Sequence, residues 1–299
     1  MKELGIDVME EDGFPLPAWS VQEHLRFMAD AGISHSVLTL PAPHIHNGVD
    51  GPAIAAARRI NGEMASYVKN DPDHFSFCAC LPLPAVSGTI DEIRHAYDDL
   101  GAIGVKMPTN ANGVYLGDSE LDPVMEELNR RNALVIIHPC RARKIPDNVI
   151  TSKVMAVYEY PADTTRAVIN MIANRIMSRY PQIRWIVPHT GSFLAWELQR
   201  FKGVSGILAS LKMMETVNVE EEVKNLYYDI AGDPEPFALE MLMRITDEKH
   251  IVYGSDWPHS PSPIVISKKK HLEENSAYAG ILERIMYQNG EDLLKAAMQ

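Results

Sequence analysis

The feature that restricts the fold most is an alternation of short, β-branched apolar segments with longer segments of helical spacing. Near-continuous apolar runs of this kind are typical of parallel strands that are covered on both faces. Strands and helices in alternation predict either a doubly wound sheet or a (β/α)8 barrel. Seven segments have the strand pattern: 36–40, 75–81, 103–107, 134–137, 185–187, 226–230 and 251–254.

Two of the intervening segments show the helical pattern clearly. The segment 121–128 places apolar residues at i, i+3, i+4 and i+7, which is one face of a helix. The segment 168–176 has a similar spacing, and Asp163 and Thr164 just upstream offer oxygens for an N-cap. Pro181 is expected to end this second helix.

The strand count bears on the choice between sheet and barrel. A closed barrel needs eight strands, and the sequence shows seven, with no buried strand pattern before Gln22. No Gly-rich dinucleotide loop or Walker-type loop follows any strand, which disfavours a nucleotide-binding sheet. We therefore predict an α/β fold, a TIM (β/α)8 barrel whose first strand is absent or irregular, in a single domain over residues 1–299.

Composition excludes several classes of protein. Acidic residues outnumber basic ones by 40 to 28, a net charge of −12 that argues against nucleic-acid binding. No apolar run approaches the roughly 18–20 residues of a membrane span. The first twelve residues carry five carboxylates where a signal peptide would be basic and then apolar. Three cysteines are too few for a disulfide framework, so we expect a cytoplasmic protein without a membrane partner.

Side chains that bind metals or transfer protons follow three of the predicted strands. His138 follows the strand 134–137, His189 follows 185–187, and Asp256 comes just after 251–254. In a (β/α)8 barrel the active site is built where the strands end, so these three groups are expected to converge. Imidazole nitrogen and carboxylate oxygen together suit Zn²⁺ or Mn²⁺. Such a metal polarises a carboxylate or carbonyl, or activates a bound water.

The same strand ends resemble motifs of a known family. Residues 186–193 (IVPHTGSF) resemble the PHxGG element of the amidohydrolase-related proteins, residues 253–258 (YGSDWP) their GTDxP, and residues 136–139 (IIHP) their FVHP. The resemblance covers nearly the whole chain, with the motifs in the expected order. It is strongest to the branch of aminocarboxymuconate-semialdehyde, γ-resorcylate and 6-methylsalicylate decarboxylases. Further matching segments are 14–20, 113–118 and 163–167.

The resemblance implies a metal-dependent-hydrolase barrel and a role for each strand-end residue. His138 would be the metal ligand after the fifth strand of the family. His189 would be the second catalytic histidine, close to the metal. Asp256 would be both metal ligand and general acid or base, whereas Asn289 resembles a structural residue. Relatives are often dimers or larger, so a homo-oligomer is expected.

The chain departs from the family pattern at the first strand. Family members open with a strand that ends in His-x-His or Glu-x-His and supplies two metal ligands, whereas this chain starts in what resembles the loop after that strand. We therefore expect half of the family's protein ligands to be missing. The one His-x-His here, His44 and His46, matches a position after the second strand. These two residues are expected to line the substrate pocket, with partial replacement of the missing ligands as the alternative.

Other residues near the motifs have two interpretations each. Arg141 and Arg143 follow the His138 motif and would clamp a substrate carboxylate or belong to a solvated loop. Lys106 faces the pocket or extends its amine to the surface. Trp257 and Phe193 form an aromatic wall for a planar substrate or pack in the core.

The expected function is metal-dependent, non-oxidative decarboxylation of a small aromatic or unsaturated carboxylic acid. Asp256 would deliver a proton to the carbon that bears the carboxylate, and His189 would stabilise or relay charge. Two alternatives stay open at this point. One is hydrolysis of a lactone or amide by a metal-bound hydroxide, with Asp256 as base. The other is a non-catalytic protein that has lost its metal site.

Overall fold

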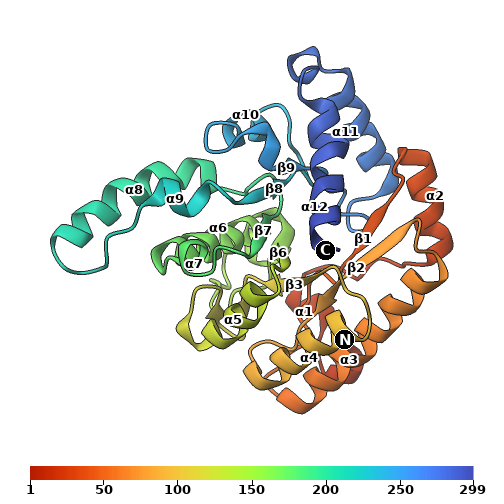
Figure 1. Cartoon of the computed structure of the whole chain (residues 1–299), viewed down its shortest axis with the longest axis horizontal. Helices are drawn as coiled ribbons and strands as arrows, with labels where there is room; N and C mark the ends of the chain where they lie inside the picture. The colour runs from red at the N-terminus through yellow and green to blue at the C-terminus, as the bar shows by residue number, and fades with distance from the viewer. Residues whose placement is uncertain (299) are drawn as a thin grey trace.

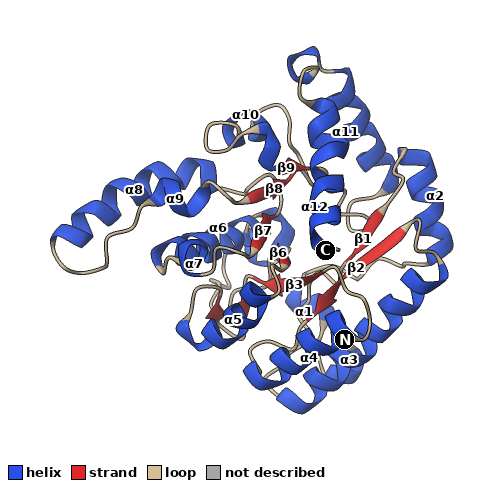
Figure 2. Ribbon diagram, in the orientation of Figure 1, coloured by secondary structure: helices blue, strands red, loops and turns tan. Residues whose placement is uncertain are grey.

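The computed structural model describes residues 1–298, and its core is one parallel sheet of seven strands. Neighbouring strands follow the order β1-β2-β3-β6-β7-β8-β9. They are β1 (Ser36–Leu38), β2 (Phe75–Cys80), β3 (Gly104–Pro108), β6 (Leu134–His138), β7 (Arg184–Val187), β8 (Tyr227–Asp229) and β9 (Ile251–Val252). In Figure 2 these strands form a curved row with helices along its outer side. The seven predicted strands are confirmed, and the sheet is an incomplete (β/α)8 barrel.

The α-helices lie before, between and after the strands, and most of them cover the outer face of the sheet (Figure 1). They are α1 (Val8–Glu11), α2 (Val21–Ala31), α3 (Asp50–Asn70), α4 (Val86–Asp98), α5 (Asp122–Arg130), α6 (Glu159–Ala173), α7 (Ile176–Arg179), α8 (Leu194–Ser210), α9 (Val219–Val223), α10 (Ala238–Leu242), α11 (Ser262–Glu274) and α12 (Asn289–Ala297). Local chemistry sets their ends. Helix α2 begins where the Ser20 hydroxyl accepts the Glu23 backbone N–H, and it ends at Gly32, whose φ of 64° suits a C-cap glycine.

The sheet is open between β1 and β9, its two edge strands. Aromatic side chains from both edges meet beside this opening. The indole of Trp257, after β9, stacks on Phe27 of α2, with ring centroids 4.9 Å apart and an interplanar angle of 5°. His24 of α2 lies 4.7 Å from the same indole and 5.2 Å from the ring of Phe75 in β2. Packing of side chains, rather than strand pairing, therefore connects the two edges.

The end of the sheet where the strands begin is closed by α12. An apolar cluster joins this helix to three strands and consists of Leu134, Ile186, Val252 and Leu293. The buried amide of Asn289 donates to the carbonyl oxygens of Glu248 at 2.6 Å and Ile251 at 2.7 Å. Asn289 thus has the structural role that the family resemblance implied. With this end filled, the opposite end is left for a site.

The predicted start of the helix near residue 168 is wrong. Helix α6 begins at Glu159, so Asp163 and Thr164 lie inside it and neither caps it. The Asp163 carboxylate is buried and instead accepts hydrogen bonds from Thr109, Asn110 and Tyr115, all outside the helix. A residue type that usually caps is stable inside this helix because tertiary donors satisfy its oxygens.

The segment after α6 also differs from the expectation. Helix α6 ends at Ala173, and residues Ile176–Arg179 form the separate helix α7 before Pro181. Arg175 between them has a positive φ of 57°, which breaks the helix. A two-stranded hairpin, β4 (Asn110–Ala111) with β5 (Val114–Tyr115), was not predicted either.

Helix α8 projects from the barrel together with α9, as Figure 1 shows. One buried face of α8 carries Leu194 and Leu198. Its exposed side carries large apolar residues as well. Within residues 1–298 no helix has both the length and the apolar character required to cross a membrane.

Candidate metal and catalytic site

Three ligand-type side chains meet where the strands end. His138 is the last residue of β6, His189 follows β7, and Asp256 lies four residues beyond the end of β9. Each offers one ligand atom, and these three atoms all lie within 4.8 Å of one another. All three residues are partly exposed, so the cluster opens to solvent. The convergence predicted from the strand ends is therefore present in the structure.

His138 is held with one ring nitrogen free. Its Nδ1–H donates to the Pro139 carbonyl oxygen at 2.9 Å, since a carbonyl only accepts, and this leaves Nε2 as the free acceptor. Burial, and then the charges of Lys106 and His189, hold the pKa of His138 well below its ordinary value. A neutral imidazole with its second nitrogen fixed by a carbonyl is the form that binds metals.

His189 stands in a turn of unusual backbone conformation. Residues 189–192 all have positive φ, with 55° at His189 and 71° at Gly191. A Cβ at Gly191 would lie 3.2 Å from side-chain atoms of Leu242 and Tyr228, so glycine suits both the space and the conformation. The His189 ring lies 5.8 Å from that of His138, and its buried Nδ1 has no hydrogen-bond partner among residues 1–298.

Asp229 fixes the start of this turn and was not identified from the sequence. It is the last residue of β8, and its Oδ1 accepts the backbone N–H groups of His189 at 2.9 Å and Ala231 at 3.1 Å. Burial raises the pKa of its carboxyl group, and the Asp256 charge adds to the rise. Its place at a strand end was the signal that could have identified it.

Asp256 also has a positive φ, 54°, in the loop after β9. The backbone of the following turn holds it, since the Ser260 N–H donates to the Asp256 carbonyl oxygen at 2.8 Å. The Ser260 hydroxyl lies 3.3 Å from Oδ2, which leaves Oδ1 without a protein partner among the hydrogen bonds of residues 1–298. Asp256 therefore presents a carboxylate oxygen to the cluster.

The structure does not bring His44 and His46 into the cluster. His44 is buried and its Nε2 donates to the Leu83 carbonyl oxygen at 2.7 Å. Burial is the main reason that its pKa falls to about 3. Both nitrogens of His46 are used, one by Asp50 at 2.9 Å and the other by Asn112 at 2.7 Å. Their role in substrate binding stays a prediction, and neither histidine joins the three ligand atoms of the cluster.

Arg141 and Trp257 both have protein partners. The Arg141 guanidinium donates to the Glu10 carbonyl oxygen at 2.9 Å. The Trp257 N–H donates to the Ser262 hydroxyl at 2.8 Å while its ring stacks on Phe27. These contacts give both residues a structural role, and their predicted contact with substrate stays a prediction.

The N-terminal segment 7–14 crosses the side of the mouth formed by the loop after β6. The buried Asp12 accepts a hydrogen bond from the Tyr160 hydroxyl, and its backbone oxygen accepts the Met155 N–H at 3.1 Å. A Cβ at Gly13 would lie 1.8 Å from the Lys153 oxygen, so only glycine permits this crossing. Burial raises the pKa of the Asp12 carboxyl group.

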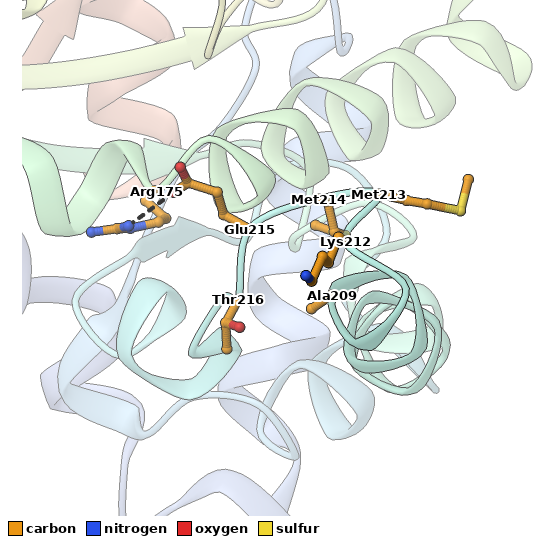
Figure 3. A pocket seen from close by; sticks show the side chains of 7 residues that line it. All are labelled: Arg175, Ala209, Lys212, Met213, Met214, Glu215 and Thr216. Atoms are coloured by element: carbon orange, nitrogen blue, oxygen red, sulfur yellow. Dashed lines mark hydrogen bonds and ion pairs between the residues drawn. The ribbon is translucent and has the colours of Figure 1, made fainter.

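A hollow of about 650 Å³ lies elsewhere, at the outer end of α8 (Figure 3). It is open to solvent and is lined by Arg175, Ala209, Lys212, Met213, Met214, Glu215 and Thr216. An ion pair of 3.1 Å between Arg175 and Glu215 crosses it, and no histidine or cysteine lines it.

Two imidazoles and one carboxylate at one mouth of an incomplete barrel define a class of protein, the metal-dependent barrel enzymes. The family model of the amidohydrolases matches residues 14–296. The chain belongs to this amidohydrolase family, and the resemblance noted in the sequence is confirmed.

Relatives and solved structures agree with this assignment. The chain is 26% identical to the 6-methylsalicylic acid decarboxylase of Penicillium expansum, covering 88% of this chain and 82% of that protein. A crystal structure of an amidohydrolase II is 31% identical, with a TM-score of 0.90 over 95% of this chain and 92% of that one. The 5-carboxyvanillate decarboxylase of Novosphingobium aromaticivorans, solved with manganese and a nitrobenzoic acid, shares the fold at 20% identity, with a TM-score of 0.84 over 91% of this chain and 79% of that one.

Proposed function

We propose that the protein is a metal-dependent, non-oxidative decarboxylase of a small aromatic or unsaturated carboxylic acid. One observation carries the proposal: the ligand atoms of His138, His189 and Asp256 lie within 4.8 Å of one another at the open end of the barrel. The similarity to 6-methylsalicylic acid decarboxylase supports the reaction class.

The donor set fits a divalent cation, Zn²⁺ or Mn²⁺. Two imidazole nitrogens and one carboxylate oxygen are ligands that both metals accept, and the Nε2 of His138 has no hydrogen-bond partner among residues 1–298. The manganese in 5-carboxyvanillate decarboxylase supports this choice. When bound, such a cation polarises the carboxylate of the substrate and a neighbouring oxygen.

Two side chains of the protein, Asp256 and His189, have roles in the reaction. Asp256, in its protonated form, gives its proton to the ring carbon that bears the carboxylate. The bond between that carbon and the carboxylate then breaks, its electron pair returns to the ring, and CO₂ leaves. Asp256 regains a proton from water for the next turnover. His189, the second imidazole of the cluster, stabilises the charge that develops during these steps.

The substitution Asp256→Asn tests the proposal, because asparagine keeps the shape and removes the proton. We expect CO₂ release from hydroxybenzoic acids to fall by about a hundredfold or more, with an unchanged circular dichroism spectrum. Asp98→Asn, which changes an exposed carboxylate on α4 paired with Arg131, is the matched control and should keep full activity. An unchanged rate in Asp256→Asn would refute the assignment.

Product and metal analysis separate the alternatives. A lactone or amide consumed without CO₂ would indicate a hydrolase instead. Purified protein with neither stoichiometric zinc nor manganese, and without activity after either metal is added, would indicate a non-catalytic protein.

The proposal extends to the setting of the enzyme. We propose one domain over residues 1–299, located in the cytoplasm, where its three buried cysteines stay free thiols. We also propose a homo-oligomer, supported by the exposed apolar residues of α8. Nucleic acid is not among its expected partners, since the net charge is −12.

A further inference from the structure

Lys106 of β3 is a buried amine without a partner. The residue is 1% exposed, and its Nζ has neither a hydrogen bond nor an ion pair within residues 1–298. Of its two interpretations from sequence, extension of the amine to the surface is excluded. A buried charged group without a partner is rare and calls for a physical explanation.

Strand register places Lys106 one inward position before His138 on the neighbouring strand. Lys106 pairs with Ile136, and the next inward position along β6 is His138, which pairs with Pro108. Lys106 therefore lies at the floor of the mouth whose rim carries His138.

No carboxylate of the protein neutralises this amine. The Lys106 charge is one of the causes that lower the pKa of the buried Asp12 carboxyl group. Burial has the larger effect and raises that pKa. One Asp12 oxygen is taken by Tyr160 and the other has no partner among residues 1–298, and no ion pair joins Asp12 to Lys106. Within residues 1–298 the Lys106 amine therefore has no anionic partner.

We propose that Lys106 binds the carboxylate of a small aromatic acid. The substrate then supplies the counter-ion that no side chain of residues 1–298 provides. This inference rests on the proposed function and assigns a substrate-binding residue to it. A buried ammonium strongly favours an anion over a neutral ligand, because the anion restores the electrostatic energy that the charge lost on leaving water. Specificity for an acid over the corresponding phenol would follow from Lys106.

Ligand binding without turnover tests the proposal. Benzoate and phenol are titrated into the metal-loaded protein by calorimetry, for the wild type and for Lys106→Met. We expect Lys106→Met to weaken benzoate binding by about tenfold or more while phenol binding stays the same. Lys295→Met, which removes an exposed amine on α12, is the matched control and should leave both affinities unchanged.

A second readout excludes a merely structural role. Because Lys106→Met removes an unpaired buried charge, its ligand-free melting temperature should equal or exceed that of the wild type. A fall of several degrees, shared by Asp12→Asn, would show an internal ion pair and overturn the proposal. Benzoate affinity retained by Lys106→Met would also overturn it. If Lys106→Met does not fold, Lys106→Gln provides the same comparison.

The two proposals fail separately. Wild-type protein that binds benzoate through Lys106 but releases CO₂ from no acid would contradict the decarboxylase and leave the binding role intact. Full carboxylate affinity in Lys106→Met, together with loss of turnover in Asp256→Asn, would contradict the role of Lys106 alone.

Discussion

His189 and Asp256 present their side chains from left-handed backbone, with φ of 55° and 54°. Such conformations cost about 1–3 kcal/mol per residue and persist only where the surroundings enforce them. Asp229 provides part of this enforcement, since its carboxylate accepts the first N–H of the turn 189–192. At this scale the site depends on a residue outside the three-residue cluster.

Replacement of Asp229 separates its geometry from its charge. Asp229→Ala leaves the His189 N–H without its acceptor, and we expect a loss of about 1–3 kcal/mol in the free energy of unfolding. Asp229→Asn keeps an oxygen for both N–H groups and should retain most of the stability. Urea denaturation measures both, and weaker Mn²⁺ binding in Asp229→Ala alone would show that the residue positions His189. Equal stability of Asp229→Ala and the wild type would contradict this role.

The sequence predicted part of the site because the ligand residues follow recognisable strands. His138, His189 and Asp256 each come after an apolar run, and parallel strands end at one edge. Lys106 was recognised only as ambiguous, because a sequence does not show whether a lysine has a partner. The hydrogen bond between Asp12 and Tyr160 joins residues 148 positions apart, and no local pattern indicates it.

At the scale of helices and strands, some features follow from the local sequence and others from contacts between distant segments. The strands were predictable because burial on both faces requires continuous apolar runs. The start of α6 was not, because the oxygens of Asp163 are satisfied by side chains of another element, including Thr109. Contacts between distant segments thus overruled a local capping preference.

Helix α2 depends on a neutral histidine, which predicts a pH effect. His24 Nδ1 accepts the Trp19 indole N–H at 3.1 Å, so the proton must be on Nε2, which donates to Ser36 at 3.2 Å. Burial lowers the His24 pKa from 6.5 to about 4. Below pH 6.5 the unfolded chain therefore binds a proton that the folded chain does not, and stability falls until about pH 4.

Thermal melts between pH 7 and pH 4 test this effect. The melting temperature of the wild type should decrease more steeply over this range than that of His24→Gln, which cannot take up the proton. His271→Gln changes a histidine that is 76% exposed and should follow the wild type. Parallel curves for the wild type and His24→Gln would show that His24 does not control the acid sensitivity.

For the molecule as a whole, the sequence indicated an incomplete barrel but not how its open side is closed. Seven apolar runs predicted seven strands, and the sheet has that number. The stack of Trp257 on Phe27 joins segments 230 residues apart in sequence, which no periodicity encodes. The projection of α8 from the barrel was not indicated either, because its apolar residues occur on both faces.

The exposed face of α8 predicts how copies of the chain assemble. Trp196, Val204, Ile207 and Leu211 lie 40–71% exposed at spacings of eight, three and four residues, which puts them on one side of the helix. Burial of this stripe against the same stripe of a second copy would remove it from water in a two-fold symmetric contact.

Light scattering on the purified protein measures the assembly. We expect the wild type to be a dimer or larger at micromolar concentration, and Ile207→Glu to be a monomer with an unchanged circular dichroism spectrum, since the contact would bury two uncompensated carboxylates. Tyr287→Glu introduces the same charge at a residue that is 55% exposed outside α8 and should keep the wild-type mass. A monomeric wild type, or an Ile207→Glu protein of unchanged mass, would show that α8 does not mediate the association.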